Sequence, residues 1–216
     1  MQRPENQHLA APCEDAMNTT TTNQYVLSID LGSSDLKAAL VGDDGRIVAS
    51  ADEPTRTTLF PGGGAEQDPV QWWQNAKKAA TAVIVKAGIP AKKIVAVACD
   101  SQWSVVVPVD ENADPLMGAV HWLDTRGGKY NRQLTAGFPA IQGYQVWKLM
   151  QWIRLTGLAP THTGVDSMGH VLFIKNERPD IYRQTFKFLE PMDYLTARLS
   201  GKIVATQKTM APFVIT

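Results

Sequence analysis

The chain has 216 residues, 44% of them hydrophobic and 19% charged, and its 21 basic and 21 acidic side chains give a formal net charge of zero. This length suits one sizeable domain, and the hydrophobic content excludes a disordered or low-complexity body. Without a basic excess the chain lacks the electrostatic signature of nucleic-acid or anionic-membrane binding, and its longest apolar run, residues 94–99, is too short to span a bilayer. We therefore expect neither a nucleic acid nor a membrane as a partner.

Residues 1–23 are expected to form a disordered leader. They hold four charged residues, two prolines and a run of threonines, with no central apolar stretch that would make an export signal. The two cysteines, Cys13 and Cys99, offer neither a disulfide framework nor metal-ligand spacing. These features favour a cytoplasmic protein.

The first part of the folded chain is predicted to be rich in strands. Residues 25–30 form a short apolar run that ends in an aspartate. Residues 36–41 and 46–51 follow as two strands joined by an Asp-Gly hairpin turn, so three consecutive antiparallel strands are expected. The glycine-rich segment 57–65 predicts a mobile loop.

A helix is predicted next, with Asp68 as its N-cap, Pro69 in its first turn and an end at Gly88. Residues 94–99 show no polar alternation, which predicts a strand buried on both faces. A further hairpin is expected within residues 105–120, because two apolar runs flank a turn there.

The second half of the chain is predicted to be mostly helical. The candidate helices cover residues 124–135, 146–155, 167–177 and 192–199. Trp147 and Trp152 lie on one amphipathic helix and are expected in the core. No repeat or linker marks a second domain, so the β-β-β-α-β start and helical second half indicate one α/β domain with a mixed sheet.

The turn after the first strand is the first candidate site. Asp30 ends the strand, and Gly32, Ser33 and Ser34 turn the chain back. Backbone N–H groups and hydroxyls in such a turn can bind an anion, while the carboxylate can hold a metal ion that bridges phosphates. This is phosphate-site chemistry, but the same residues also form ordinary hairpin turns.

A second group of polar residues, 100–104, follows the apolar strand. Gln102 can hydrogen-bond hydroxyl groups and Trp103 can cover the apolar face of a sugar, since ligands of α/β sheets bind where buried strands end. The plain alternative is that Ser101 and Gln102 begin a loop.

The segment His121–Arg126 is the third candidate. Trp122 can supply an aromatic platform beside Asp124 and Arg126, which can bind hydroxyls. Alternatively, Trp122 lies in the core, Asp124 is the N-cap of the next helix and Arg126 is solvated; a capping role for Asp124 is expected in either case. The four histidines have no zinc or triad spacing, and we expect His121 and His170 to be structural.

Taken in order, these motifs resemble the FGGY family of carbohydrate kinases, with xylulokinase-like members closest. The resemblance rests on Asp-x-Gly-Ser-Ser-x-x-Lys at 30–37, Glu66-Gln67-Asp68-Pro69 before Trp72-Trp73, Ser101-Gln102, Trp122-x-Asp124-x-Arg126, and segments 169–179 and 188–201. It implies a ribonuclease-H-like fold of the actin and hexokinase type, built as two lobes, of which the first binds sugar and the second most of the ATP.

The resemblance also implies roles for individual residues in a cytoplasmic kinase that uses ATP and Mg²⁺. Asp30 would position the metal and the phosphates, Gly32, Ser33 and Ser34 would line the phosphate loop, and Lys37 would lie nearby. The residues facing a sugar or polyol would be Gln102, Trp103, Ser104, Trp122, Asp124 and Arg126. Xylulokinase-like members carry Gln-Met-His where this chain has Gln102-Trp103-Ser104, so the substrate is left open.

The aspartate that acts as general base in this family lies in a Gly-Asp segment, which we expect beyond Thr216, so no catalytic residue is assigned. We expect residues 24–216 to be an incomplete N-terminal lobe without the nucleotide lobe, inactive by itself; a homodimer is left open. The alternatives are a non-catalytic carbohydrate-binding module, or the partner of a separate nucleotide lobe.

Overall fold

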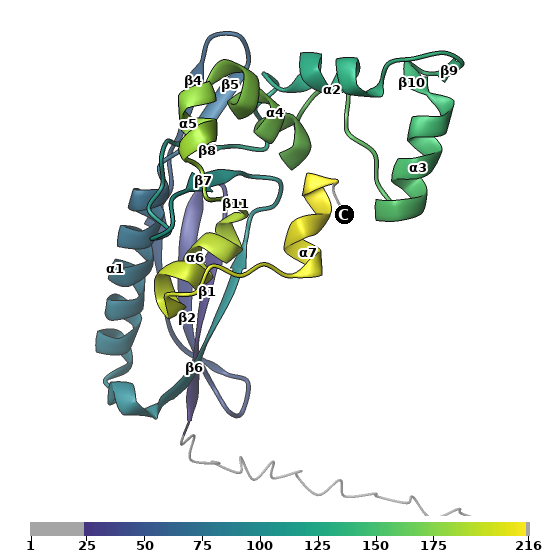
Figure 1. The fold of residues 1–216 in the computed structure, drawn as a ribbon. Helices are drawn as coiled ribbons and strands as arrows, with labels where there is room; N and C mark the ends of the chain where they lie inside the picture. Colours follow the sequence, from purple (N-terminus) through teal and green to yellow (C-terminus); the bar gives the residue numbers. More distant parts are fainter. Residues whose placement is uncertain (1–23, 215–216) are drawn as a thin grey trace, which may run out of the picture.

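The computed structural model describes residues 24–214, so the expected leader at 1–23 and the last two residues, 215–216, lie outside the described residues. A four-stranded mixed sheet in the order β3-β2-β1-β6 forms the base of the molecule (Figure 1). Its strands are β1 (Tyr25–Leu31), β2 (Asp35–Gly42), β3 (Ile47–Pro54) and β6 (Ile94–Ser101). The three consecutive antiparallel strands are confirmed, and β6 joins β1 in parallel.

Helix α1 (Pro69–Ala87) begins and ends where the sequence predicts. The Asp68 carboxylate accepts a hydrogen bond from the Val70 N–H at 2.8 Å, and Gly88 adopts the left-handed φ of 63° that ends many helices. The buried stripe of α1 packs on the sheet, where alternate side chains of β1 and β2 point inward. This stripe consists of Trp72, Ala76, Ala79 and Val83.

Residues 57–67 form a β-hairpin, so the expected loop over 57–65 is wrong as a description of its structure. Strands β4 (Thr57–Phe60) and β5 (Gly64–Gln67) pair in antiparallel, and β8 (Ala119–Val120) extends them into a second sheet. Gly62 and Gly63 form the tight turn between β4 and β5 with positive φ, and Gly64 begins β5. This hairpin brings Gln67 to the turn between β1 and β2, where its amide nitrogen donates to the Ser33 carbonyl.

Strand β6 is not buried on both faces as predicted. Val95 and Val97 are 57% and 45% exposed. Within the described residues β6 is an edge strand with β1 as its one neighbour, and α1 and α6 cover the opposite face of the sheet from the row that carries Asp30. Continuous apolar sequence therefore did not reveal that this strand lies at an edge.

The predicted hairpin within 105–120 exists in loose form. Val106, just before strand β7 (Val107–Val109), forms an isolated bridge with Val120 of β8, and β7 pairs fully with β11 (Lys187–Leu189) from far along the chain.

The second half of the described chain is mainly helical, as expected. Its helices are α2 (Gly128–Thr135), α3 (Val146–Thr156), α4 (Ser167–Glu177), α5 (Pro179–Gln184), α6 (Pro191–Ser200) and α7 (Gln207–Met210), with short 3₁₀ turns at Ala91–Lys93 and Ala211–Phe213. Helix α6 joins the main core beside α1, where Tyr194 meets Trp72 edge to face with ring centroids 6.3 Å apart. None of the helices over 24–214 is long and apolar enough to cross a membrane.

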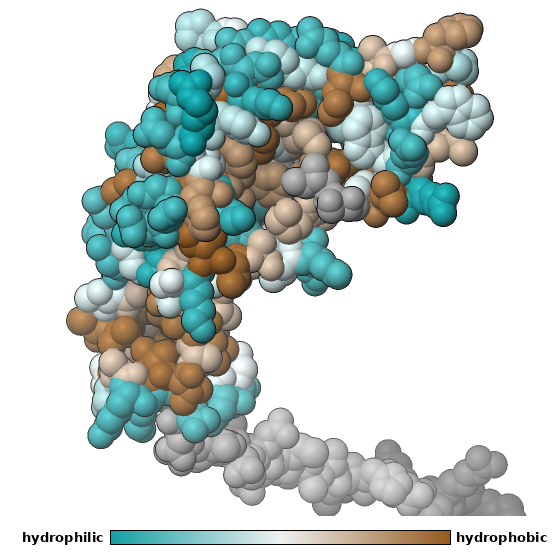
Figure 2. All heavy atoms as spheres, in the orientation of Figure 1, coloured by the Kyte–Doolittle hydropathy of each residue, from teal (hydrophilic) through white to brown (hydrophobic). Residues whose placement is uncertain are grey.

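An arm projects sideways from this body (Figure 1). We use this name for residues 137–158, which hold the two-stranded hairpin β9 (Ala140–Ile141) and β10 (Tyr144–Gln145), and helix α3. Trp147 is 61% exposed and α3 has no buried residue, so the predicted core position of Trp147 and Trp152 is wrong. The space-filling view shows the arm extending from the body with hydrophobic residues at its tip (Figure 2).

Candidate functional site

The first candidate site is a tight turn between two strands of the main sheet. The Gly32 N–H donates to the Asp35 carbonyl at 3.0 Å, and a Cβ at Gly32 would lie 2.9 Å from that same oxygen, so glycine fits best here. Asp30 precedes the turn and is exposed. Its strand neighbours across the sheet are Lys37 in β2 and Asp100 in β6, which places two carboxylates and one ammonium in one row.

Gln102 lies at the centre of a polar network that joins this turn to distant parts of the chain. The Ser33 hydroxyl donates to Gln102 Oε1 at 3.0 Å, and the Gln102 amide nitrogen donates to Gln67 Oε1 at 2.7 Å. The indole N–H of Trp122 donates to the Ser33 hydroxyl oxygen at 3.0 Å. The structure therefore brings together Ser33, Gln102 and Trp122, which the sequence placed in three separate motifs.

Gln67 is the residue that holds this network against the core, and the sequence analysis did not assign it. It is buried, its amide nitrogen donates to the Ser33 carbonyl and the Thr57 hydroxyl, and its Oε1 also accepts from the indole of Trp72. Every polar atom of its amide thus has a partner. Its place beside Asp68-Pro69 in the motif was the available signal.

His121 belongs to the same network. Its Nδ1 accepts from the Leu123 N–H at 3.3 Å, which leaves Nε2 as the donor to Gln102 Oε1 at 3.0 Å. Burial, and then the nearby His170, lower the pKa of His121 to about 4, so the ring is neutral near pH 7. A structural role was expected, and the structure adds that this role is to orient Gln102.

Asp124 and Arg126 form a buried ion pair behind the network. The Asp124 side chain is fully buried and accepts from the Ala65 N–H at 2.8 Å and from Arg126 Nε at 2.8 Å, while Arg126 also pairs with Glu66 at 2.7 Å. Asp124 is not the N-cap of α2, which begins after Gly127, because its carboxylate is already used by Ala65 and Arg126. These residues tie β5 to the loop before α2, and direct sugar contact by either one stays a prediction.

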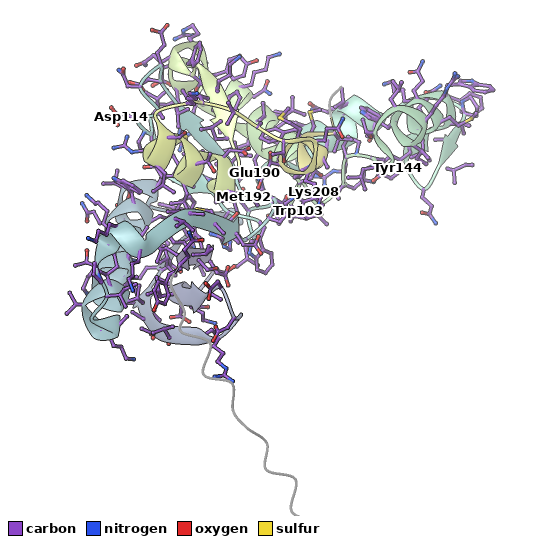
Figure 3. The ribbon with its side chains drawn as sticks, turned by 90° about the horizontal axis from the view of Figure 1, so that it is seen from below. Trp103, Asp114, Tyr144, Glu190, Met192 and Lys208 are labelled. Carbon is purple, nitrogen blue, oxygen red and sulfur yellow. The ribbon has the colours of Figure 1, made fainter. Side chains whose placement is uncertain are left out.

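Trp103 and Ser104 follow Gln102 in sequence, but their side chains contact other parts of the chain. The Ser104 hydroxyl turns back to donate to the Val165 carbonyl at 2.8 Å, and its φ is 61°. Trp103 is 56% exposed and lines a separate pocket of about 430 Å³ with Glu190, Met192 and Lys208. Figure 3 shows these four side chains gathered at one place, far from Tyr144 on the arm. Glu190 is a further pocket residue that the sequence analysis did not assign.

The described residues thus offer a polar surface of Ser33 and Gln102 with the Trp122 indole beside it, next to the turn at residues 32–35, while Trp103 lies in its separate pocket. Trp122 is 41% exposed and can stack on a ligand while Ser33 and Gln102 hydrogen-bond its hydroxyls. Over residues 24–214, no group of three or more His, Cys, Asp and Glu side chains is placed to hold a metal ion. A metal at Asp30 would need further oxygen ligands from phosphate or water.

The sequence analysis assigned no residue to the role of general base. The expected position of this base beyond Thr216 falls outside the described residues 24–214, so it stays a prediction.

The comparisons with known proteins agree on one family. The family model described as "FGGY family of carbohydrate kinases, N-terminal domain" matches residues 25–213. Xylulose kinase of Bacillus subtilis is 27% identical over 180 residues, which are 83% of this chain and 34% of that protein. Xylulose kinase of Escherichia coli is 27% identical over 187 residues, 86% of this chain and 35% of that protein.

Solved structures show the same fold. The crystal structure of xylulose kinase from Rhodospirillum rubrum matches with a TM-score of 0.76 and 21% identity over 88% of this chain and 37% of that one. The ligand-bound xylulose kinase from Lactobacillus acidophilus gives a TM-score of 0.73 at 21% identity, over 89% of this chain and 36% of that one. The expected ribonuclease-H-like fold is thereby confirmed. The chain spans about a third of the length of the relatives that it matches.

Proposed function

Because the chain belongs to the FGGY family of carbohydrate kinases and is xylulokinase-like, we propose that residues 24–216 are the sugar-binding lobe of an ATP-dependent kinase for a sugar or polyol. One observation carries this proposal: Ser33, Gln102 and Trp122, from three distant motifs, meet in one hydrogen-bonded surface. Such a surface has the mixed polar and aromatic character of a sugar site.

Each side chain of this surface has a part in binding. Gln102 is held in one orientation because Gln67 accepts from its nitrogen and His121 donates to its oxygen. The Ser33 hydroxyl is oriented in the same way by Gln102 and Trp122. Fixed amide and hydroxyl groups lose little freedom when a ligand binds, which favours affinity and selectivity for a defined pattern of hydroxyls.

The turn at residues 32–35 suits the phosphate end of the reaction. Asp30 and Asp100 are paired one residue before the ends of neighbouring parallel strands, and their carboxylate oxygens are the hard ligands that Mg²⁺ prefers. When bound, Mg²⁺ and ATP would supply a phosphoryl group with its charge partly neutralised. Lys37 would add a positive charge opposite Asp30, and the exposed Ser34 hydroxyl would face the phosphates.

The candidate substrates come from the named relatives and from the residues that follow Gln102. The curated relatives are named xylulose kinases, so xylulose is the first sugar to test. Trp103 and Ser104 replace the Met-His pair of that group, and an indole beside a small hydroxyl changes the shape of the pocket. We therefore include other pentoses, hexoses, polyols and aldonic acids.

Isothermal calorimetry on the purified chain tests the proposal. We expect one of these compounds to bind, and the substitution Gln102→Leu to weaken that binding by about tenfold or more, since it leaves the buried partners of Gln102 unpaired. Gln74→Leu, at an exposed glutamine of α1, is the matched control and should bind as the wild type does. Unchanged binding by Gln102→Leu would contradict the assigned site.

Turnover is measured separately with ATP, Mg²⁺ and the sugar that binds. We expect no sustained ADP release from these 216 residues alone. Sugar-dependent ADP release would contradict that expectation and would show a complete kinase. Binding without turnover also fits a carbohydrate-binding module or a chain that works with a separate nucleotide lobe, and restoring turnover by adding such a lobe would distinguish the two.

A further inference from the structure

Glu190 is a fully buried acid whose side chain hydrogen-bonds to a loop that is distant in sequence. It lies between β11 and α6 and is 1% exposed. Pro191 begins α6, and Glu190 stands at the N-cap position, yet its carboxyl makes no hydrogen bond to that helix. A buried carboxyl needs hydrogen-bond partners, and since this one does not bond to the first N–H groups of α6, its partners must lie on other segments.

The partners of Glu190 lie on two other segments. The Ser167 hydroxyl donates to Oε1 at 2.7 Å, and the Val105 N–H donates to Oε2 at 3.3 Å. The Ser104 N–H also contacts the carboxyl. The antiparallel pairing of Leu189 with Val107 explains this approach, because it brings the residue after β11 alongside the residues before β7.

These contacts fix the segment 101–105, which we call the Gln102 loop. Ser104 adopts a left-handed φ of 61°, a conformation that a residue with a side chain keeps only where its surroundings hold it. Its hydroxyl is held by the Val165 carbonyl on one side, and its backbone by Glu190 on the other. The N–H of Gln102 donates to the Leu31 carbonyl at 2.7 Å. Between these fixed points lie the side chains of Gln102 and Trp103.

We propose that Glu190 is a positioning residue, which holds the Gln102 loop so that Gln102 and Trp103 are presented to the substrate. The effect on the substrate rests on the function proposed above, while the effect on the loop does not. Burial raises the pKa of Glu190 to about 8, so the side chain is protonated near pH 7 and resembles a glutamine in its hydrogen bonding. Glu190 also lines the pocket of Trp103, so the same residue contacts both the Gln102 loop and this pocket (Figure 3).

Three substitutions test this role. Glu190→Gln keeps an acceptor oxygen for the Val105 N–H, and its amide nitrogen can donate to Ser167 Oγ in place of the hydrogen bond that Oε1 accepts from that hydroxyl. Glu190→Leu removes both, and Ser167→Ala removes one partner only, which keeps the test available should the leucine variant not fold. Asp193→Asn is the matched control, because Asp193 is also buried with a raised pKa but contacts Thr209 and the Glu190 backbone rather than the Gln102 loop.

Hydrogen exchange of the peptide that covers residues 101–106 is the first readout, and calorimetry with the sugar that binds the wild type is the second. For Glu190→Leu we expect exchange at least about tenfold faster in this peptide and sugar affinity about tenfold weaker, since buried N–H groups lose their acceptor. Ser167→Ala should show a smaller change of the same kind, and Glu190→Gln and Asp193→Asn should behave like the wild type.

Unchanged exchange over 101–106 in both Glu190→Leu and Ser167→Ala would overturn the proposal. So would equal acceleration in Asp193→Asn, because it would show a general loss of stability. A wild type that binds none of the sugars would refute the proposed function instead, and the exchange data would still decide whether Glu190 holds the loop. Faster exchange with unchanged sugar affinity would overturn the positioning role.

Discussion

The body and the arm use apolar side chains of the same kind in opposite ways. In the body, the stripe of α1 is buried against β1 and β2, and Trp72 is fully enclosed. In the arm, α3 has no buried residue, and Trp147 and Met150 are more than half exposed. The spacing of apolar residues therefore shows which side of a helix is apolar, but the covering surface decides whether that side is buried.

The candidate site lies wholly on the body. Its network runs from the end of β1 through Gln102 to Gln67, which is bonded directly to the core residue Trp72. The arm contributes no residue to it. Precise placement of polar groups here depends on the packed core beneath them, and changes in the body should matter far more than changes in the arm.

The largest effect is expected at a pair of tryptophans, one in each region. Trp72→Ala should lower the free energy of unfolding by about 3–5 kcal/mol, because it opens a cavity in the core. It also leaves Gln67 Oε1 with one donor fewer, which should weaken sugar binding. Trp147→Ala should change the unfolding free energy by less than about 0.5 kcal/mol, since its side chain is already largely in water.

Urea denaturation followed by circular dichroism measures both variants. Equal losses of unfolding free energy in the two variants would contradict the difference between body and arm, because they would show that the side chain of Trp147 is covered in solution. A slope against urea that changes only in Trp147→Ala would instead point to altered association or compactness through the arm.

The second effect concerns acid stability and again belongs to the body. Burial lowers the pKa of His170 to about 4, and the pKa of His121 is likewise about 4. Since a histidine in the unfolded chain has a pKa near 6.5, the unfolded state takes up protons first, and stability is lost as the pH falls from about 6.5 towards 4.

Removing one of these histidines should reduce that loss. Between pH 7 and pH 5, His170→Leu should lose about 2 kcal/mol less unfolding free energy than the wild type. Urea titrations at the two pH values give this difference directly. Trp147→Ala should keep the wild-type dependence, and a wild type equally stable at both pH values would refute the role assigned to burial of these rings.

Much of the body could be predicted from the sequence, because its signals are local. The Asp68-Pro69 start and Gly88 end of α1, the hairpin at 43–45 and the bounds of α4 all follow from capping and turn chemistry. The edge position of β6 and the exposure of the arm did not follow, because they depend on which surfaces meet in three dimensions.

The site was predictable to a similar degree. The residue types of three motifs pointed to Ser33, Gln102 and Trp122, which the structure brings together. Gln67 and Glu190 were missed because the contacts that join them to the site, Gln67 with Ser33 and Glu190 with Val105, span 34 and 85 residues of sequence. A pattern along the chain does not contain such contacts unless a resemblance to known proteins supplies them.

The smallest expected effect is the sharpest test of the comparison, because it applies the same local change to both regions. Gly88 ends α1 and Gly157 ends α3, with φ of 63° and 75°, and a Cβ at either would meet nothing within 4 Å. Alanine at either position should therefore cost only the left-handed backbone strain, about 1 kcal/mol.

The two costs should appear in different measurements. In Gly88→Ala the strain should lower the stability of the whole body, because α1 unfolds with the core. The global unfolding free energy should therefore fall by about 1 kcal/mol. In Gly157→Ala the strain should open only the arm, so hydrogen exchange should quicken in residues 146–156 while the urea midpoint stays unchanged. Equal shifts of the urea midpoint in both variants would show that α3 unfolds with the body, and that the arm is held by contacts as cooperative as those of α1.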